Sequence, residues 1–214
     1  MNETDENYYW NEVYSSNVNT VWGDSEPDSR MRELVLTKLR NYRGKSIRVL
    51  DIGCGNGRNS KIFNELPFIE VDYYGIDFAP AVIEYCTKTY NNRTFFYQDI
   101  TRDIELPEKK FELIIDFGCF HCLTPEKRKK YAENIIKISG KDTLFIMRAW
   151  YGDEKPVKQK PDFITYLVLN VWFVNILDVK SLFCPDFQLE HYFLEKNPPY
   201  DINNGMIYFI LKRS

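Results

Sequence analysis

The sequence predicts an α/β fold in which a doubly wound, mostly parallel sheet of seven strands ends in an antiparallel hairpin. Short apolar runs alternate with helical patterns of about 10 to 15 residues, which is typical of right-handed βαβ units. The first run, 47–52, leads directly into a glycine-rich turn. Two strand-like runs near the end, 187–195 and 206–212, have no helical pattern between them. They therefore predict the closing hairpin.

Turn residues and β-branched runs place the strands. In chain order they are predicted at 47–52, 71–76, 94–97, 111–117, 143–147, 187–195 and 206–212. The first five should pair in parallel, because helical patterns separate most of them. The last two are separated by Pro198-Pro199 and Asn203-Asn204-Gly205, and these residue types form turns.

Capping residues and helix breakers delimit the first two predicted helices. Asp28 or Ser29 can cap the first helix, which should run to about residue 42 and stop at Gly44. The second helical stretch covers 56–66, and Pro67 ends it.

Two further helices carry proline at their start. Pro80 begins a helix that continues to Tyr90. Thr124 is predicted to cap the next helix, with Pro125 at its first position and Gly140 closing it.

Length, charge and cysteine use narrow the class of protein. A chain of 214 residues with a net charge of -3 fits one domain, 1–214, and does not favour a nucleic-acid partner. The basic run Lys127–Lys130 is interpreted as the solvated face of a helix. The apolar run Phe163–Leu177 is shorter than the roughly 18 residues of a spanning helix, so membrane contact is not favoured. Five scattered cysteines and a polar start indicate a cytoplasmic protein. Whether it is a monomer or a homodimer stays open.

The glycine-rich turn is the most informative motif. It reads Asp51-Ile52-Gly53-Cys54-Gly55-Asn56-Gly57 between a predicted strand and a predicted helix. Glycines allow a tight turn and close approach of a ligand, and the helix start that follows attracts anions. Dinucleotide enzymes favour the spacing G-x-G-x-x-G. Here the third glycine comes one residue early, so a nicotinamide-dependent oxidoreductase is the less favoured alternative.

Three acidic residues follow successive strands. Asp51, Asp77 and Asp99 lie at or just beyond the ends of the first three predicted strands. The carboxyl ends of parallel strands meet at one sheet edge, where open α/β folds bind their ligands. A carboxylate offers only acceptors and can bind a ribose diol. The alternative is that each residue caps a strand end.

The spacing Asp51-x-Gly53-x-Gly55-x-Gly57 resembles the class I S-adenosylmethionine-dependent methyltransferases, from about Asp28 to the end of the chain. The resemblance implies a Rossmann-like fold and S-adenosyl-L-methionine as cofactor, with S-adenosyl-L-homocysteine as product. The segment Asp116–His121 is similar to the thiol, thiopurine and tellurite-resistance (TehB-like) branch. That similarity implies methyl transfer to a small-molecule acceptor, a thiol or chalcogen compound. The alternatives are an O- or N-methyltransferase of a small metabolite and a non-catalytic S-adenosylmethionine-binding regulatory protein.

The predicted cofactor-binding residues follow the first four strands. They are Asp51, Gly53, Cys54, Gly55, Asn56, Gly57, Arg58, Asp77, Phe78, Asp99, Ile100, Asp116, Phe117 and Gly118. The predicted substrate and lid residues are aromatic: Tyr9, Trp10, Tyr14, Trp22 and Trp150. Residues 1–27 are interpreted as an aromatic lid, with packing of an extra helix as the alternative. Residues 151–186 are interpreted as an acceptor-pocket insertion.

His121 is the candidate catalytic residue, because an imidazole can remove a proton from an acceptor. The alternative is a packed histidine at a strand end. Cys119 and Cys122 flank it, but three ligands within four residues give poor zinc geometry, so no metal is predicted. The run Phe163–Leu177 must be buried or meet a partner. Three roles stay open for it: a wall of the acceptor pocket, a contact between two copies of the chain, or a contact with a membrane.

Overall fold

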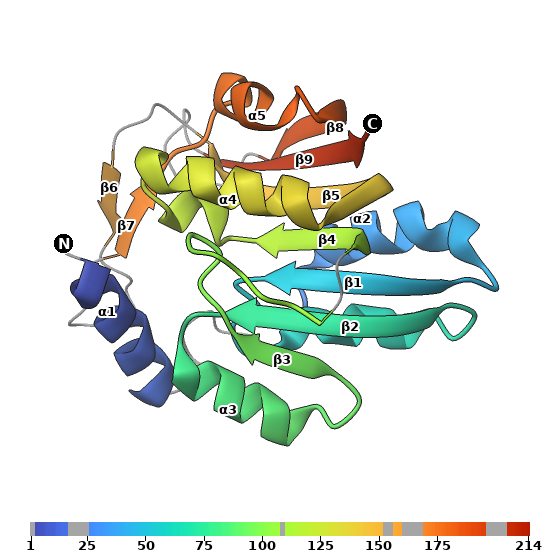
Figure 1. Cartoon of the computed structure of the whole chain (residues 1–214), viewed down its shortest axis with the longest axis horizontal. Helices are drawn as coiled ribbons and strands as arrows, with labels where there is room; N and C mark the ends of the chain where they lie inside the picture. The colour runs from blue at the N-terminus through green and yellow to red at the C-terminus, as the bar shows by residue number, and fades with distance from the viewer. Residues whose placement is uncertain (1–2, 17–25, 108–109, 152–155, 160–168, 196–204) are drawn as a thin grey trace.

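The computed structural model describes residues 3–16, 26–107, 110–151, 156–159, 169–195 and 205–214 (Figure 1). Its main sheet has seven strands in the order β3-β2-β1-β4-β5-β9-β8. Their bounds are β1 Ser46–Ile52, β2 Glu70–Asp77, β3 Thr94–Tyr97, β4 Phe111–Phe117, β5 Ser139–Tyr151, β8 Phe187–Glu195 and β9 Gly205–Arg213. The first five strands pair in parallel, and β9 lies antiparallel between β5 and β8. The predicted fold class is confirmed.

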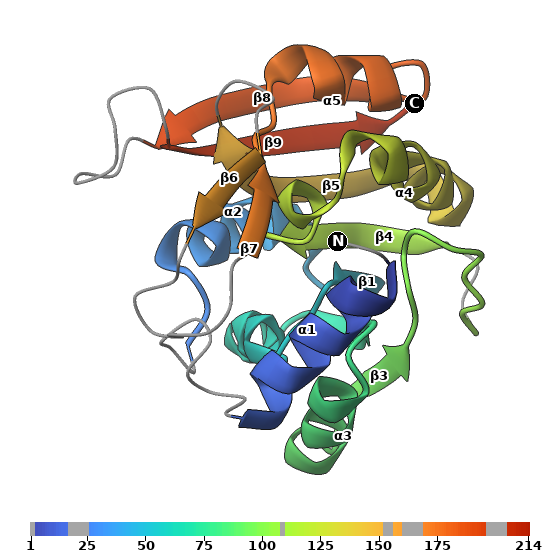
Figure 2. The same ribbon diagram turned by 90° about the vertical axis from the view of Figure 1, so that its left-hand side faces the viewer.

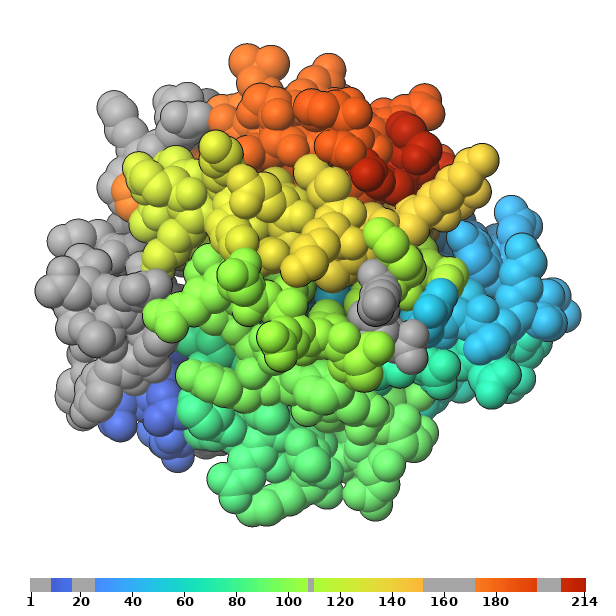
Figure 3. Space-filling view, viewed as in Figure 1, coloured from blue at the N-terminus to red at the C-terminus, as the bar shows by residue number. Residues whose placement is uncertain are grey.

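Helices cover both faces of this sheet (Figures 1 and 2). They are α1 Glu3–Ser16, α2 Ser29–Leu39, α3 Pro80–Thr89, α4 Pro125–Ile138 and α5 Ile176–Phe183, with short 3₁₀ helices η1 Arg40–Tyr42, η2 Arg58–Glu65 and η3 Phe120–Cys122. Helices α1, α2, η2 and α3 bury apolar side chains on one face. Helices α4 and α5 do so on the other face. In the space-filling view, the yellow atoms of α4 and the green segments below them form the middle of this face of the molecule (Figure 3).

Strand order reverses between β1 and β4, since β2 and β3 extend to one side of β1 and β4 and β5 to the other. Such a switch point opens a crevice at the carboxyl ends of the two central strands, where an open α/β sheet binds its ligand. The fold therefore places the glycine turn after β1 and the loop after β4 beside each other.

Two helix boundaries differ from the prediction. The helix predicted at 56–66 is the 3₁₀ helix η2. It begins at Arg58 rather than at residue 56, because Gly57 before it has a left-handed backbone, with φ of 74°. Thr124 occupies the N-cap position of α4, but its side chain makes no capping hydrogen bond. Gly140 does not close α4, which ends at Ile138, and lies within β5. The extended backbone at Ser139 starts the strand directly after the helix.

The insertion after β5 contains elements that the sequence did not predict. A two-stranded sheet forms from β6 Pro156–Gln159 and β7 Leu169–Trp172, and α5 follows. Asn175 caps α5 in a capping box with Asp178. The apolar run 163–177 is therefore divided between β7 and α5, and its residues 163–168 lie outside the described part. Among the described helices, none is both long and apolar enough to cross a membrane.

Arg128 is not solvated, which corrects the interpretation of the basic run on α4. Its side chain is 3% exposed and donates hydrogen bonds to the carbonyls of Trp172, at 2.7 Å, and Phe173, at 3.3 Å. The guanidinium also lies over the Phe120 ring, 4.8 Å from its centre. Arg128 thus fixes the end of β7 to α4, because extended backbone at the end of a short sheet lacks strand partners for its carbonyls.

Replacing Arg128 with methionine should lower the free energy of unfolding by about 1–2 kcal/mol, because two carbonyls lose their donor. Thermal unfolding would record a fall of roughly 2–4 °C per kcal/mol in a domain of this size. Lys129, the exposed neighbour on the same helix, supplies the matched control Lys129→Met. Equal melting temperatures for the two variants would contradict this role of Arg128.

Candidate functional site

The glycine turn after β1 is built from left-handed residues. Gly53, Gly55 and Gly57 have φ values of 61°, 50° and 74°, a region that other residues rarely adopt. A Cβ at Gly53 would also lie 2.7 Å from the Cβ of Cys119, in the loop after β4. The turn and that loop therefore touch, and the contact leaves no room for a side chain.

Asp77 joins the end of β2 to this turn. Its Oδ2 accepts a hydrogen bond from the Gly55 amide at 3.0 Å, and its Oδ1 accepts one from the Ala79 amide at 3.0 Å. The side chain is almost fully buried, and burial raises the pKa of Asp77 to about 6. An ionised carboxylate has about four acceptor positions, so Asp77 keeps capacity for donors of a ligand.

Asp51 lies beneath the same turn and is completely buried. Its Oδ2 accepts hydrogen bonds from the Tyr73 hydroxyl, at 2.5 Å, and from Asn59 Nδ2, at 3.1 Å. Burial is the main cause that raises its pKa from the ordinary value of 3.8 to about 7. Asp51 thus supports the turn from the core of the sheet.

The contribution of Asp51 to the stability of the chain should fall as the pH rises from about 4 to about 7. A carboxyl whose pKa is raised on folding binds its proton more tightly in the folded state than in the unfolded state. Its contribution to folding stability is therefore complete at pH values below the unfolded pKa, and it is lost as the pH rises through the folded pKa. For Asp51 that window runs from 3.8 to about 7. Asp51→Asn cannot ionise and should remove about 1–2 kcal/mol of the pH dependence.

Urea denaturation at several pH values would measure this slope. The control is Asp72→Asn, which changes an exposed aspartate on β2. A slope that is the same in Asp51→Asn as in the unaltered chain would refute the assignment.

Asp99 shapes the turn after β3. Its Oδ1 accepts hydrogen bonds from the Thr101 amide and hydroxyl at 2.8 and 2.7 Å, and Arg102 Nε lies 3.4 Å from Oδ2. The carboxylate is partly exposed, whereas Ile100 beside it is 5% exposed. Phe78, after β2, is half-buried. The structure brings these residues to the same sheet edge as the glycine turn, since β2 and β3 pair in parallel.

Asp116 organises the loop after β4. Its Oδ1 accepts from the amides of Gly118 and Cys119, and its Oδ2 accepts from the amide of Phe120 and the Tyr131 hydroxyl, at 2.5–3.0 Å. The side chain is completely buried, and burial raises its pKa to about 6. All four hydrogen bonds come from groups of the protein itself, so Asp116 stabilises the conformation of the loop.

His121 lies in that loop with 4% of its surface exposed. Its Nδ1 has no hydrogen-bond partner among the described residues. Burial, then the positive charges of Arg148 and Arg128, lower the pKa of His121 to about 3. The imidazole is therefore neutral at physiological pH and accepts a proton poorly.

The two cysteines beside His121 carry half-buried thiol groups. Burial raises the pKa of Cys119 well above its ordinary value. Cys122 Sγ lies 3.3 Å from the Gly118 carbonyl. Across the described segments, no group of three metal-ligating side chains comes together.

Helix α1 crosses the carboxyl edge of the sheet next to α3 (Figure 2). The Oδ1 of Asn11 accepts a hydrogen bond from the Ala81 amide at 3.3 Å. The Tyr14 hydroxyl lies 3.0 Å from where a Cβ of Gly55 would stand, and Trp10 stacks on Tyr14 at 5.9 Å. Of the predicted lid residues, Tyr14 thus touches the glycine turn, Trp10 packs on Tyr14 and Tyr9 packs on Trp10, whereas Trp22 lies outside the described residues. Trp150, at the end of β5, packs against the apolar core on the face of the sheet that α1, α2, η2 and α3 cover.

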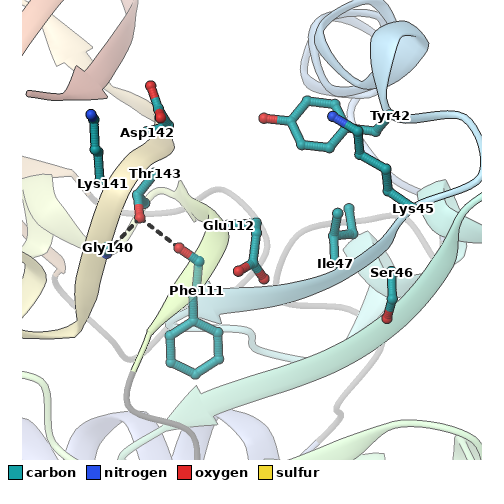
Figure 4. A pocket seen from close by; sticks show the side chains of 10 residues that line it. All are labelled: Tyr42, Lys45, Ser46, Ile47, Phe111, Glu112, Gly140, Lys141, Asp142 and Thr143. Atoms are coloured by element: carbon teal, nitrogen blue, oxygen red, sulfur yellow. Dashed lines mark hydrogen bonds between the residues drawn. The ribbon is translucent and has the colours of Figure 1, made fainter.

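A separate hollow of about 250 Å³ opens at the opposite edge of the sheet (Figure 4). Its lining comes from the starts of β1, β4 and β5 and from η1: Tyr42, Lys45, Ser46, Ile47, Phe111, Glu112, Gly140, Lys141, Asp142 and Thr143. Amino ends of strands do not carry the ligand crevice of an open parallel sheet. The candidate site is therefore the carboxyl edge, where the glycine turn and the loop after β4 meet.

Comparison with known sequences identifies the domain. Residues 49–140, which include this turn, match the family model described as a methyltransferase domain. Methyltransferase 235L of Invertebrate iridescent virus 6 is 33% identical over 104 residues, covering 47% of this chain and 37% of the viral protein. A tRNA N(3)-cytidine methyltransferase of Mus musculus is 28% identical over 149 residues, covering 64% and 51%. The chain thus spans about a third to a half of the length of these relatives.

Solved structures share the whole fold. A magnesium protoporphyrin IX methyltransferase from Synechocystis with bound SAH aligns with a TM-score of 0.71 at 14% identity, covering 99% of both chains. A TehB-like methyltransferase from Corynebacterium glutamicum aligns with a TM-score of 0.64 at 20% identity, covering 97% of this chain and all of the other. With the sequence match at the glycine turn, these findings give one conclusion: residues 49–140 match a methyltransferase domain, and the chain has the fold of S-adenosylmethionine-dependent methyltransferases.

Proposed function

We propose that the chain binds S-adenosylmethionine at the carboxyl edge of its sheet and transfers the methyl group to a small-molecule acceptor, leaving S-adenosylhomocysteine. The observation that carries the proposal is the left-handed glycine turn bonded at Gly55 to the carboxylate of Asp77. The Asp77 carboxylate, beside a turn that has no side chains, suits a ribose diol, because both hydroxyls can donate hydrogen bonds to it. The site thus fits a nucleoside cofactor.

The cofactor would supply an electrophilic methyl group on a sulfonium. The chain must then orient a nucleophile behind that carbon and exclude water. The loop Gly118–Cys122, fixed by Asp116, borders the glycine turn through the contact between Cys119 and Gly53. We assign the acceptor to the space beside this loop.

The state of His121 bears on the acceptor class. An imidazole with a pKa of about 3 is a weak base at neutral pH. It would give little help to a hydroxyl or ammonium group that must lose a proton. A thiol, selenol or telluride ionises more readily and attacks as a soft nucleophile, so we extend the proposal to a thiol or chalcogen acceptor.

Two elements would enclose this acceptor. Helix α1 brings Tyr9, Trp10 and Tyr14 over the site, and we assign it the role of a lid that excludes water. Strand β7 contacts η3, which holds His121, so the insertion 151–186 would form one wall. A small acceptor also agrees with the net charge of -3, because a polynucleotide substrate calls for clustered cations.

Calorimetry and a turnover assay would test the function in sequence. Titration with S-adenosylhomocysteine should give saturable binding, and titration with NADH should give none. Release of S-adenosylhomocysteine from S-adenosylmethionine is then measured with thiols, selenite, tellurite, small phenols and amines. Turnover confined to phenols or amines would refute the chalcogen assignment. Binding without turnover of any acceptor would favour a regulatory S-adenosylmethionine-binding protein.

A further inference from the structure

Arg148, near the end of β5, is a largely buried cation with incomplete pairing. Its side chain is 16% exposed, and its Nε is enclosed without a hydrogen-bond partner among the described residues. The nearest carboxylate oxygen, Oδ2 of Asp28, lies 4.0 Å from Nη2, which is beyond hydrogen-bond distance. The other oxygen of Asp28 already accepts from the Arg30 and Met31 amides as the cap of α2.

The aromatic rings around Arg148 hold its guanidinium at one place. Its Cζ lies 4.4 Å from the centre of the Phe117 ring and 5.9 Å from that of Tyr208. Phe117 is the last residue of β4 and is directly opposite Arg148 in the strand pairing. The flat cation is therefore fixed against Phe117, the residue that directly precedes the loop carrying Gly118 and His121.

A second cation strengthens the positive potential at this point. Arg58, the first residue of η2 after the glycine turn, has its Cζ 5.4 Å from the same Phe117 ring. Arg148 also contributes to the low pKa of His121 through its charge. The neutral imidazole adds no charge of its own beside these two cations, and its Nδ1 has no hydrogen-bond partner among the described residues.

A largely buried guanidinium whose Nε lacks a hydrogen-bond partner among the described residues is costly to the folded chain, and a ligand that supplies an acceptor would offset this cost. Its planar fork of donors matches an oxygen anion such as a carboxylate or a phosphate, and it can bind either through two parallel bonds. Rings that hold the fork in place reduce the entropy lost on binding, because the side chain is already ordered.

We infer that Arg148 binds an anionic oxygen group of the methyl acceptor, so that the enzyme selects acceptors carrying a carboxylate or phosphate beside the nucleophile. This assignment rests on the proposed function, because it takes the loop after β4 to be the acceptor side. Arg148 would then determine specificity, because it binds the end of the acceptor that does not carry the reacting atom.

Binding measurements on the intact chain saturated with S-adenosylhomocysteine would test the assignment without turnover. The probes are benzoate, its neutral counterpart benzamide, and inorganic phosphate. We expect benzoate or phosphate to bind at least tenfold more tightly than benzamide. The variant Arg148→Met should abolish that preference, whereas Arg40→Met, which removes an exposed arginine at the opposite edge, should keep it.

Thermal unfolding without ligand separates this role from a structural one. Arg148→Met removes an incompletely paired buried charge and should melt within about 4 °C of the unaltered chain, or above it.

The binding test has outcomes that distinguish the two anions. Binding of benzoate without binding of phosphate would identify an acceptor with a carboxylate, and binding of phosphate without binding of benzoate would identify a phosphorylated acceptor. Equal binding of all three probes, or a preference that survives in Arg148→Met, would overturn the inference. A chain that fails to bind S-adenosylhomocysteine fails the proposed function first, before any anion is added.

Discussion

Replacing Asp116 with alanine is expected to lower the free energy of unfolding by about 3–5 kcal/mol. Three backbone amides and the Tyr131 hydroxyl would lose their common acceptor in the core. Each buried donor left without a partner costs about 1–3 kcal/mol, and water entry and relaxation recover part of the sum. Urea denaturation followed by circular dichroism would measure the change.

Two graded variants locate the source of this effect. Tyr131→Phe removes one of the four donors and should cost about 1 kcal/mol. Asp116→Asn keeps one acceptor oxygen and should fall between Tyr131→Phe and Asp116→Ala. If Asp116→Ala is no less stable than Tyr131→Phe, the carboxylate does not hold the loop.

Asp77→Ala is expected to weaken the binding of S-adenosylhomocysteine by about tenfold to a hundredfold, or roughly 1–3 kcal/mol. The variant loses the acceptor proposed for the ribose and also the bond that ties the Gly55 amide to β2. Isothermal titration calorimetry gives the dissociation constant directly, and circular dichroism shows whether the chain is folded.

The matched control is Asp72→Ala, on the same strand with its side chain exposed. It should bind the product as tightly as the unaltered chain. Asp77→Asn distinguishes the two contributions, because it keeps an oxygen for the Gly55 amide and loses the charge. Full affinity in a folded Asp77→Ala would exclude this carboxylate from the cofactor site.

Local sequence patterns determined the order of elements. The β-branched run before the glycine turn gave β1, and the residue Pro80 gave the start of α3, since both act through neighbouring backbone geometry. Asp28 and Ser29 were the two predicted caps of α2, and in the structure Asp28 accepts hydrogen bonds from the Arg30 and Met31 amides. Helical patterns between apolar runs also predicted the parallel pairing. Such features depend on residues within a few positions of each other, so the sequence alone reveals them.

Local patterns did not distinguish the aspartates of the site from one another. Asp51, Asp77 and Asp116 all stand at the carboxyl ends of strands, and all were predicted to bind the cofactor. In the structure, Asp51 bonds to Tyr73 and Asp116 bonds to Tyr131, partners that lie on other elements. Whether a strand-end carboxylate supports the core or faces a ligand depends on such distant partners.

The sequence by itself determined the fold class, the glycine turn and the acids at the strand ends, because backbone preference and hydrophobic periodicity are local. Tertiary structure alone decided the burial of Arg128 and the position of Arg148 between two rings. It also placed α1 across the sheet edge. Burial and charge pairing arise only when elements pack, so the environment of a side chain is a property of the whole fold.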